Sequence, residues 1–137
     1  MLELNITIFE KPVAKMRSRK GKYGWYDSQK KEKSILQRLI KEQLFEGFVM
    51  ASKRTPVEIS TKFFFEPTIT ELKNKKFVEK ISNDDCKYTR KPDKDNLEKF
   101  LLDAMSGIIF YDDNQVCSGS VEKLYSFSAR TEIQIIF

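Results

Sequence analysis

The chain of 137 residues contains no histidine at all. Histidine is the usual general base of hydrolytic triads and the commonest zinc ligand, so its absence excludes those sites. The two cysteines, Cys86 and Cys117, belong to no CxxC pair, which excludes a zinc knuckle and favours a reducing compartment. No stretch approaches the roughly 18 consecutive apolar residues of a membrane span, and the N-terminus alternates like a strand and not like a signal peptide. We therefore expect a soluble intracellular protein, with no membrane partner, whose chemistry depends on carboxylates, lysine and metal-bound water.

Charge is unevenly distributed along the chain. The segment Glu10–Glu42 holds 11 basic and four acidic residues, a net charge of +7, whereas the rest of the chain carries −2. A basic face beside an acidic pocket suggests a polyanionic partner handled through a metal. The alternative for the basic segment alone is an ordinary solvated surface. Length and a hydrophobic content of 40% predict one folded domain over residues 1–137.

The apolar pattern predicts an α+β domain with helices packed on a mixed sheet, in the order β-α-β-α-β-β. The segment Glu66–Lys91 has no clear period and is interpreted as a long loop, with residues 66–90 mobile. The first half of the chain is expected to hold a strand over Leu2–Phe9, an irregular basic loop, a helix capped by Asp27 or Ser28 and ending at Gly47, and a strand over Thr55–Pro67. The second half is expected to hold a helix after Asp95 and two C-terminal strands, Gln115–Phe127 and Arg130–Phe137. These two strands are expected to form a hairpin around Ser128 and Ala129.

The helix after Asp95 is the best defined element. Its apolar residues fall on one stripe, namely Leu97, Phe100, Leu101, Ala104 and Ile108. Asp95, Lys99 and Asp103 fall on the opposite face, one per turn. An acid, a base and an acid therefore line the predicted outward face.

Four carboxylates gather within about twenty residues: Asp93, Asp95, Asp112 and Asp113. Each has a structural alternative, because Asp95 with Glu98 fits a capping box and the other three fit turns. Together they fit Mg²⁺, with Mn²⁺ as a substitute, since a hard cation takes carboxylate oxygens and activates water for phosphodiester hydrolysis.

Lys99 is placed to offset the repulsion of the acidic cluster and to stabilise charge on a transferring phosphoryl group. Its structural alternative is simple pairing with Asp95 and Asp103. Two other acidic motifs fit poorly. An EF-hand would need Asp or Asn where Leu97 stands and Gly where Glu98 stands, and a DxD glycosyltransferase lacks a Gly-rich phosphate cradle here.

With these residues in view, the sequence resembles the RusA-type Holliday junction resolvases common in phages and prophages. KPVAKMRSRKGKYGWY is similar to the family's N-terminal stretch, and KPDKDNLEKFLLDAMSGIIFYDDNQV is similar to its signature box. The resemblance implies a homodimeric, Mg²⁺-dependent endonuclease that cuts four-way DNA junctions in the cytoplasm of a bacterial host, with prophage origin as one option. It implies catalytic roles for Asp93, Asp95, Lys99 and Asp113, and metal binding by Asp93, Asp95, Asp113 and Asp112.

The basic loop is expected to bind DNA phosphates without reading sequence. Its candidate residues are Lys15, Arg17, Arg19, Lys20 and Lys22. One alternative function is a non-catalytic nucleic-acid-binding module in which exposed Tyr23 and Trp25 stack on bases. Another is a structural protein that binds Ca²⁺ through the acidic cluster. Phe63–Phe65 and the C-terminal IQIIF are candidates for a dimer interface, although core is the commoner role for such strands.

Overall fold

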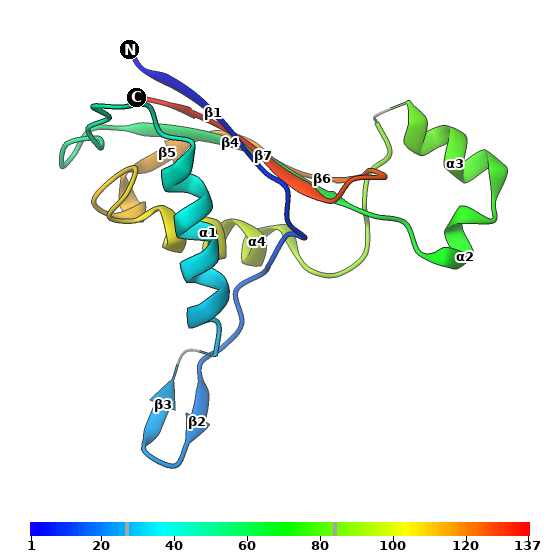
Figure 1. Cartoon of the computed structure of the whole chain (residues 1–137), viewed down its shortest axis with the longest axis horizontal. Coiled ribbons are helices and arrows are strands. Elements are labelled where there is room, and N and C mark those ends of the chain that lie inside the picture. The colour runs from blue at the N-terminus through cyan, green and yellow to red at the C-terminus, as the bar shows by residue number, and fades with distance from the viewer. Residues whose placement is uncertain (27, 84) are drawn as a thin grey trace.

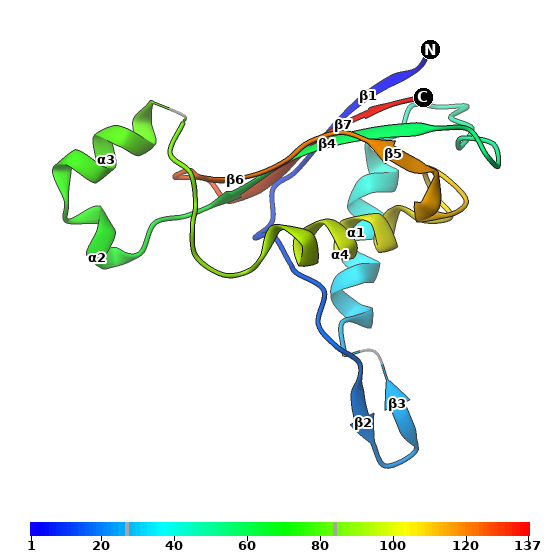
Figure 2. The ribbon, with the colours of Figure 1, turned by 180° about the vertical axis from the view of Figure 1, so that it is seen from behind.

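The computed structural model describes residues 1–26, 28–83 and 85–137, apart from the side chain of Arg19. A five-stranded mixed sheet forms one layer, and two helices cover one of its faces (Figures 1 and 2). The predicted α+β class, with a mixed sheet under helices, is confirmed. The sheet consists of β1 (Glu3–Ile8), β7 (Arg130–Ile136), β4 (Val57–Phe65), β5 (Val116–Ser118) and β6 (Val121–Tyr125).

Alternation of apolar and polar residues sets the register of the sheet. Leu4 and Ile6 of β1 stand opposite Ile135 and Ile133 of antiparallel β7, and all four side chains are buried under the helices. The residues between them point to the other face, where polar side chains meet solvent. A shift by one residue would expose this apolar set, so the pattern specifies the pairing strongly. Phe63–Phe65 are buried, and so are Ile133 and Ile135 of IQIIF, which confirms a core role for these residues.

The two C-terminal strands do not form the expected hairpin. β6 pairs with β4 in parallel and β7 pairs with β4 in antiparallel, so β4 lies between them. β4 is apolar along most of its length and buried, and a buried strand needs hydrogen-bonding partners on both edges. The expected Gln115–Phe127 strand is also split. Gly119, at φ +126°, presses so closely on the Ile59 carbonyl that a Cβ would clash, and it separates β5 from β6.

Helices α1 (Lys30–Glu42) and α4 (Lys94–Met105) form the second layer. The predicted core stripe of α4 is confirmed for Leu97, Phe100, Leu101 and Ala104, which are all buried. Ile108 lies beyond the end of the helix but still packs against the core. The N-cap of α1 is Gln29 and not Ser28, and Asp27 lies outside the described residues. No described helix has the length and apolar character needed to cross a membrane.

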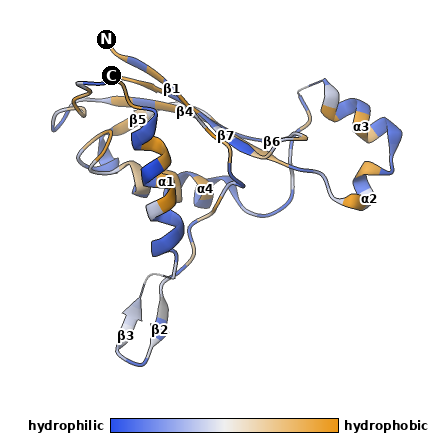
Figure 3. Ribbon diagram, in the orientation of Figure 1, coloured by the Kyte–Doolittle hydropathy of each residue, from blue (hydrophilic) through white to orange (hydrophobic). Residues whose placement is uncertain are grey.

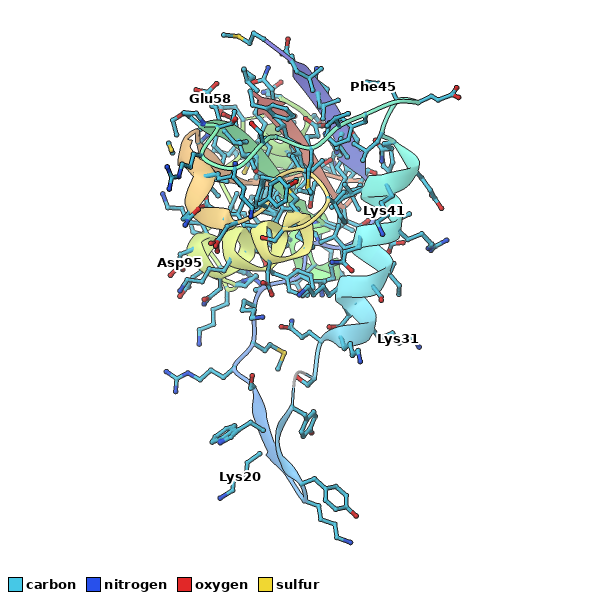
Figure 4. The ribbon with its side chains drawn as sticks, turned by 90° about the vertical axis from the view of Figure 1, so that its left-hand side faces the viewer. Lys20, Lys31, Lys41, Phe45, Glu58 and Asp95 are labelled. Carbon is cyan, nitrogen blue, oxygen red and sulfur yellow. The ribbon has the colours of Figure 1, made fainter. Side chains whose placement is uncertain are left out.

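The basic segment is more ordered than the expected irregular loop. Its second half forms a small antiparallel hairpin of β2 (Arg19–Gly21) and β3 (Gly24–Tyr26), which projects from the body (Figures 1 and 4). Buried Gln29 holds the base of this projection, because its side chain accepts from Met16 N at 2.8 Å and donates to Ala14 O at 2.6 Å.

The segment expected to be a long loop contains two helices, α2 (Ile69–Leu72) and α3 (Lys75–Ser82), so the predicted lack of regular structure there was wrong. Thr68 caps α2 in a capping box with Glu71, and Asn74 caps α3. Ile81 is buried in a satellite cluster with Cys86 and Tyr125. We call α2, α3 and their connections, residues 66–91, the arm; it extends from the end of the sheet near β6 (Figure 1).

Candidate active site

The turn into α4 presents two carboxylates to solvent. Asp93 is the N-cap of α4 by its backbone conformation, yet its side chain makes no capping hydrogen bond. The expected capping box of Asp95 with Glu98 is therefore wrong, because the helix begins one residue before Asp95. Asp93 and Asp95 are both exposed. They lie at the positive end of the helix dipole, which stabilises negative charge there.

Lys123 of the sheet and Tyr88, a few residues before the turn, hold this turn. Lys123 of β6 donates to Arg90 O at 2.6 Å and to Pro92 O at 2.7 Å, and the Tyr88 hydroxyl donates to Lys91 O at 3.2 Å. The Lys123 ammonium also lies 5.4 Å from the centre of the Tyr88 ring. Since these bonds bind the backbone immediately before Asp93, the placement of the first carboxylate depends on Lys123.

Lys99 occupies the middle of the outward face of α4, one turn after Asp95. It is exposed and makes no salt bridge with any residue that the structure describes. Asp103, one turn further, instead binds Lys15 at 2.9 Å and Lys33 at 3.4 Å. The structural alternative for Lys99, pairing with Asp95 and Asp103, is therefore not what the structure contains.

Asp103 has a structural role that joins three parts of the chain. The hydrogen bond from Lys15 is the largest influence and lowers the pKa of its carboxyl group; burial opposes this, and the charges of Lys33 and Lys15 lower the pKa further. The backbone N–H of Lys15 also donates to Asn96 O at 2.8 Å. Lys15, expected to bind DNA, is thus engaged in holding the basic segment along α4.

The second acidic pair follows α4 on a short 3₁₀ turn, η1 (Asp113–Gln115). Asp112 caps this turn by accepting from Asn114 N at 3.3 Å, so its alternative role as a turn residue is confirmed. The pKa of Asp113 is raised, first by a hydrogen bond with Asp112, then by burial, and then by the negative charges of Asp112 and Asp103. The two carboxylates therefore lie within hydrogen-bonding reach of each other.

Buried Gln115 fixes this turn in place. Its amide oxygen accepts from the backbone of Tyr111 at 2.9 Å and of Asp112 at 3.1 Å, while its nitrogen donates to Ser52 O at 2.8 Å and Thr55 O at 3.1 Å. The residue was missed by sequence reasoning, although an Asp-x-x-Gln capping pattern is present in the sequence.

The four aspartates form two pairs at opposite ends of α4 and not one cluster. Asp95 and Asp103 are eight residues apart, about 12 Å along a helix that rises about 1.5 Å per residue. Asp113 follows the other end of α4, on η1, and the charge of Asp103 is among those that raise its pKa. In the described part of the chain, no three carboxylates or thiols lie close enough together to hold one metal ion.

The basic hairpin presents cations and aromatic rings to solvent. Arg17, Lys20 and Lys22 are exposed, whereas the side chain of Arg19 lies outside the described residues. Tyr23 and Trp25 are 95% and 73% exposed, as expected for a stacking surface. Figure 4 shows Lys20 far from the body, on the projection below the end of α1.

Comparison with known protein families identifies the family to which this chain belongs. The profile of endodeoxyribonuclease RusA matches residues 10–136, which include both acidic pairs, Lys99 and the basic hairpin. The chain belongs to the RusA endodeoxyribonuclease family. It is therefore a Holliday junction-resolving endonuclease, a hydrolase that acts on branched DNA. The uncharacterized protein YqaN of Bacillus subtilis (strain 168) is 29% identical over 138 residues, with 96% of the chain and 94% of that protein covered.

RusA-family nucleases are generally dependent on divalent metals, and the donor atoms of this chain suit a hard cation. Mg²⁺ is usually bound through one or two carboxylates, with waters and substrate phosphates completing its coordination. Each acidic pair supplies two carboxylates, and the close Asp112–Asp113 pair carries negative charge that a cation would neutralise. The residues present therefore fit a divalent metal even though they do not form a three-carboxylate cage.

Proposed function

We propose that this RusA-family chain cleaves four-way DNA junctions in a Mg²⁺-dependent reaction at the outward face of α4. The observation that carries the proposal is that some charged groups around α4 make structural contacts and others do not. Asp103 and Asp112 are used in structural contacts, whereas Asp93, Asp95 and Lys99 are exposed and make no salt bridge with the described residues. Charges that do not serve the fold are those available to substrate and metal.

The metal ligands in this proposal come from the two acidic pairs, Asp93 with Asp95 and Asp113 with Asp112, and each pair would bind a cation together with waters and phosphate oxygens. When bound, Mg²⁺ would neutralise phosphate oxygens and lower the pKa of a water for attack on phosphorus. Lys99 lies between the two acidic pairs and stabilises charge on the phosphoryl group. The basic hairpin holds phosphates through Arg17, Arg19, Lys20 and Lys22, and its exposed aromatic rings stack on bases opened at the junction.

Incubation of the purified protein with a synthetic four-way junction tests the proposal. We expect cleavage with Mg²⁺ or Mn²⁺ and none with EDTA, while gel-shift binding persists in EDTA. Asp113→Asn should behave as the wild type does in EDTA. Binding that is never followed by cleavage under any metal would instead support the non-catalytic binding module.

We further propose that the active form is a homodimer. A four-way junction presents two equivalent strands related by a twofold axis, and productive resolution requires a nick in each. One chain supplies one face of α4, so a twofold dimer places two such faces in matching positions and closes without forming larger assemblies. Light scattering should therefore give twice the 16.1 kDa monomer mass. A monomer mass at micromolar concentration, with and without junction DNA, would exclude symmetric double nicking.

A further inference from the structure

The arm carries lysines that the fold does not use. Lys73, Lys75, Lys76 and Lys80 are exposed, and none forms a salt bridge with a described residue. The acidic Glu71 of α2 is engaged elsewhere, because it accepts from the Tyr125 hydroxyl at 2.6 Å and lies 3.6 Å from the Arg90 guanidinium.

The lysines of α3 fall on two sides of the helix. Phe77 and Ile81 face the satellite cluster with Tyr125. At about 100° per residue, Lys76 and Lys80 form a row one turn apart beside that buried face. Lys75 points to the outermost side, one turn before Glu79. Figure 3 colours most of the α3 ribbon as hydrophilic, with a hydrophobic part.

Lys80, one of the two lysines in the row, lines a hollow together with Phe77 of α3 and Tyr125 of β6. Arg90 and Lys87 also line this first hollow, of about 490 Å³. Lys87 also lines a second hollow, of about 570 Å³, together with Asp93 and Asp95. Lys87, which also pairs with Asp85 and Glu122, therefore lies between the hollow beside α3 and the hollow that holds the first carboxylate pair.

Like charges one turn apart repel each other, so the Lys76–Lys80 row does not stabilise α3. A phosphate backbone offers the complementary charge at close, regular spacing. The arm and the basic hairpin both project from the body, and α4 lies between them (Figures 1 and 2). A branched DNA whose scissile strand reached α4 would send a duplex arm toward each projection.

We propose that the Lys76–Lys80 row is a second phosphate-binding surface, which holds a duplex arm that leaves the junction on the side of Asp93 and Asp95. The inference rests on the proposed junction cleavage and adds a contact that the basic hairpin does not provide. It makes Lys76 and Lys80 binding residues, with no part in the chemical step.

The test compares two double variants that remove the same charge. Lys76→Gln/Lys80→Gln removes the row, and Lys41→Gln/Lys75→Gln removes exposed lysines from α1 and from the outer side of the same helix α3 (Figure 4 shows Lys41 on α1). Junction affinity is measured in EDTA across a salt series, and cleavage is measured with Mg²⁺ at saturating protein. Thermal melts check that both variants fold.

Each lost phosphate contact lowers the slope of log K against log salt by about 0.9, so the row variant should lose about 1.8 for each bound subunit. The control variant should keep the wild-type slope, and both should cleave bound junction at the wild-type rate. Equal slopes for the two variants would overturn this inference alone. A wild-type chain that neither binds nor cuts the junction would overturn the proposed function itself.

Discussion

Replacement of Lys123 by methionine should separate positioning from binding at this site. Methionine keeps an unbranched apolar stem against Tyr88 but removes the ammonium that binds Arg90 O and Pro92 O. A hydrogen bond to a charged group contributes about 1.5–3 kcal/mol to stability. Water can replace the exposed bond to Arg90 O, so the variant should lose mainly the bond to Pro92 O, about 2 kcal/mol of the free energy of unfolding. For a chain of this size that corresponds to a Tm lower by roughly 8 °C.

The loss of activity should exceed the loss of stability. Released from Lys123, the turn before Asp93 can shift, and a misplacement of about 1 Å at a reacting centre costs about 100-fold in rate. We expect single-turnover cleavage of a four-way junction at saturating protein and Mg²⁺ to fall by about that factor, at a temperature where the variant is folded. Junction affinity in EDTA should change little, since the hairpin phosphate contacts remain.

Lys62→Met is the matched control, because Lys62 lies on the neighbouring strand β4 and is exposed on the opposite face of the sheet. It removes the same charge without touching the turn. If Lys123→Met and Lys62→Met cleave at equal rates and melt at equal temperatures, Lys123 does not position Asp93 and the reasoning fails.

Three further predictions concern α4 and the turn that follows it. Asn at Asp93, Asp95 or Asp113 should abolish cleavage while junction binding persists, because each change removes a ligand charge and leaves the basic surface alone; wild-type cutting by all three variants would disprove the metal site. Lys99→Ala should cut slowly but retain the Mg²⁺ concentration dependence of the wild type, and near-normal turnover would leave Lys99 without a catalytic role. Asp103→Asn should lower stability at pH 7 by at most about 1 kcal/mol, since the ion pairs are partly exposed. The carboxyl pKa of Asp103 is lowered on folding, so its ion pairs add to the free energy of unfolding above pH 3.8, and this stabilisation is lost as the pH falls through the pKa of the folded protein. A stability difference between variant and wild type that stayed constant from pH 7 to pH 2.5 would contradict the assigned ion pairs.

Periodic segments were predicted well because their signal is local. The alternation in β1 and the apolar stripe of α4 each reflect one face that packs on the core. Such a pattern can be read from a short stretch of sequence. The exposed aromatic rings of the hairpin were also anticipated. The helices of the arm were missed because they are short, although Thr68 with Glu71 and Asn74 are caps that can be read in the sequence.

Sequence alone determined the residue types of this protein's chemistry: an acidic and lysine-bearing segment, a basic segment and no histidine. It also determined which side of α4 faces the core, because an amphipathic helix has only one apolar face to bury. Tertiary structure decided which polar groups remain available. Pairing of Asp103 with Lys15 and Lys33, and of Lys123 with the turn before Asp93, joins residues up to 88 positions apart. Contacts of that kind depend on how β6, α1 and the basic segment pack around α4, and no local pattern records them.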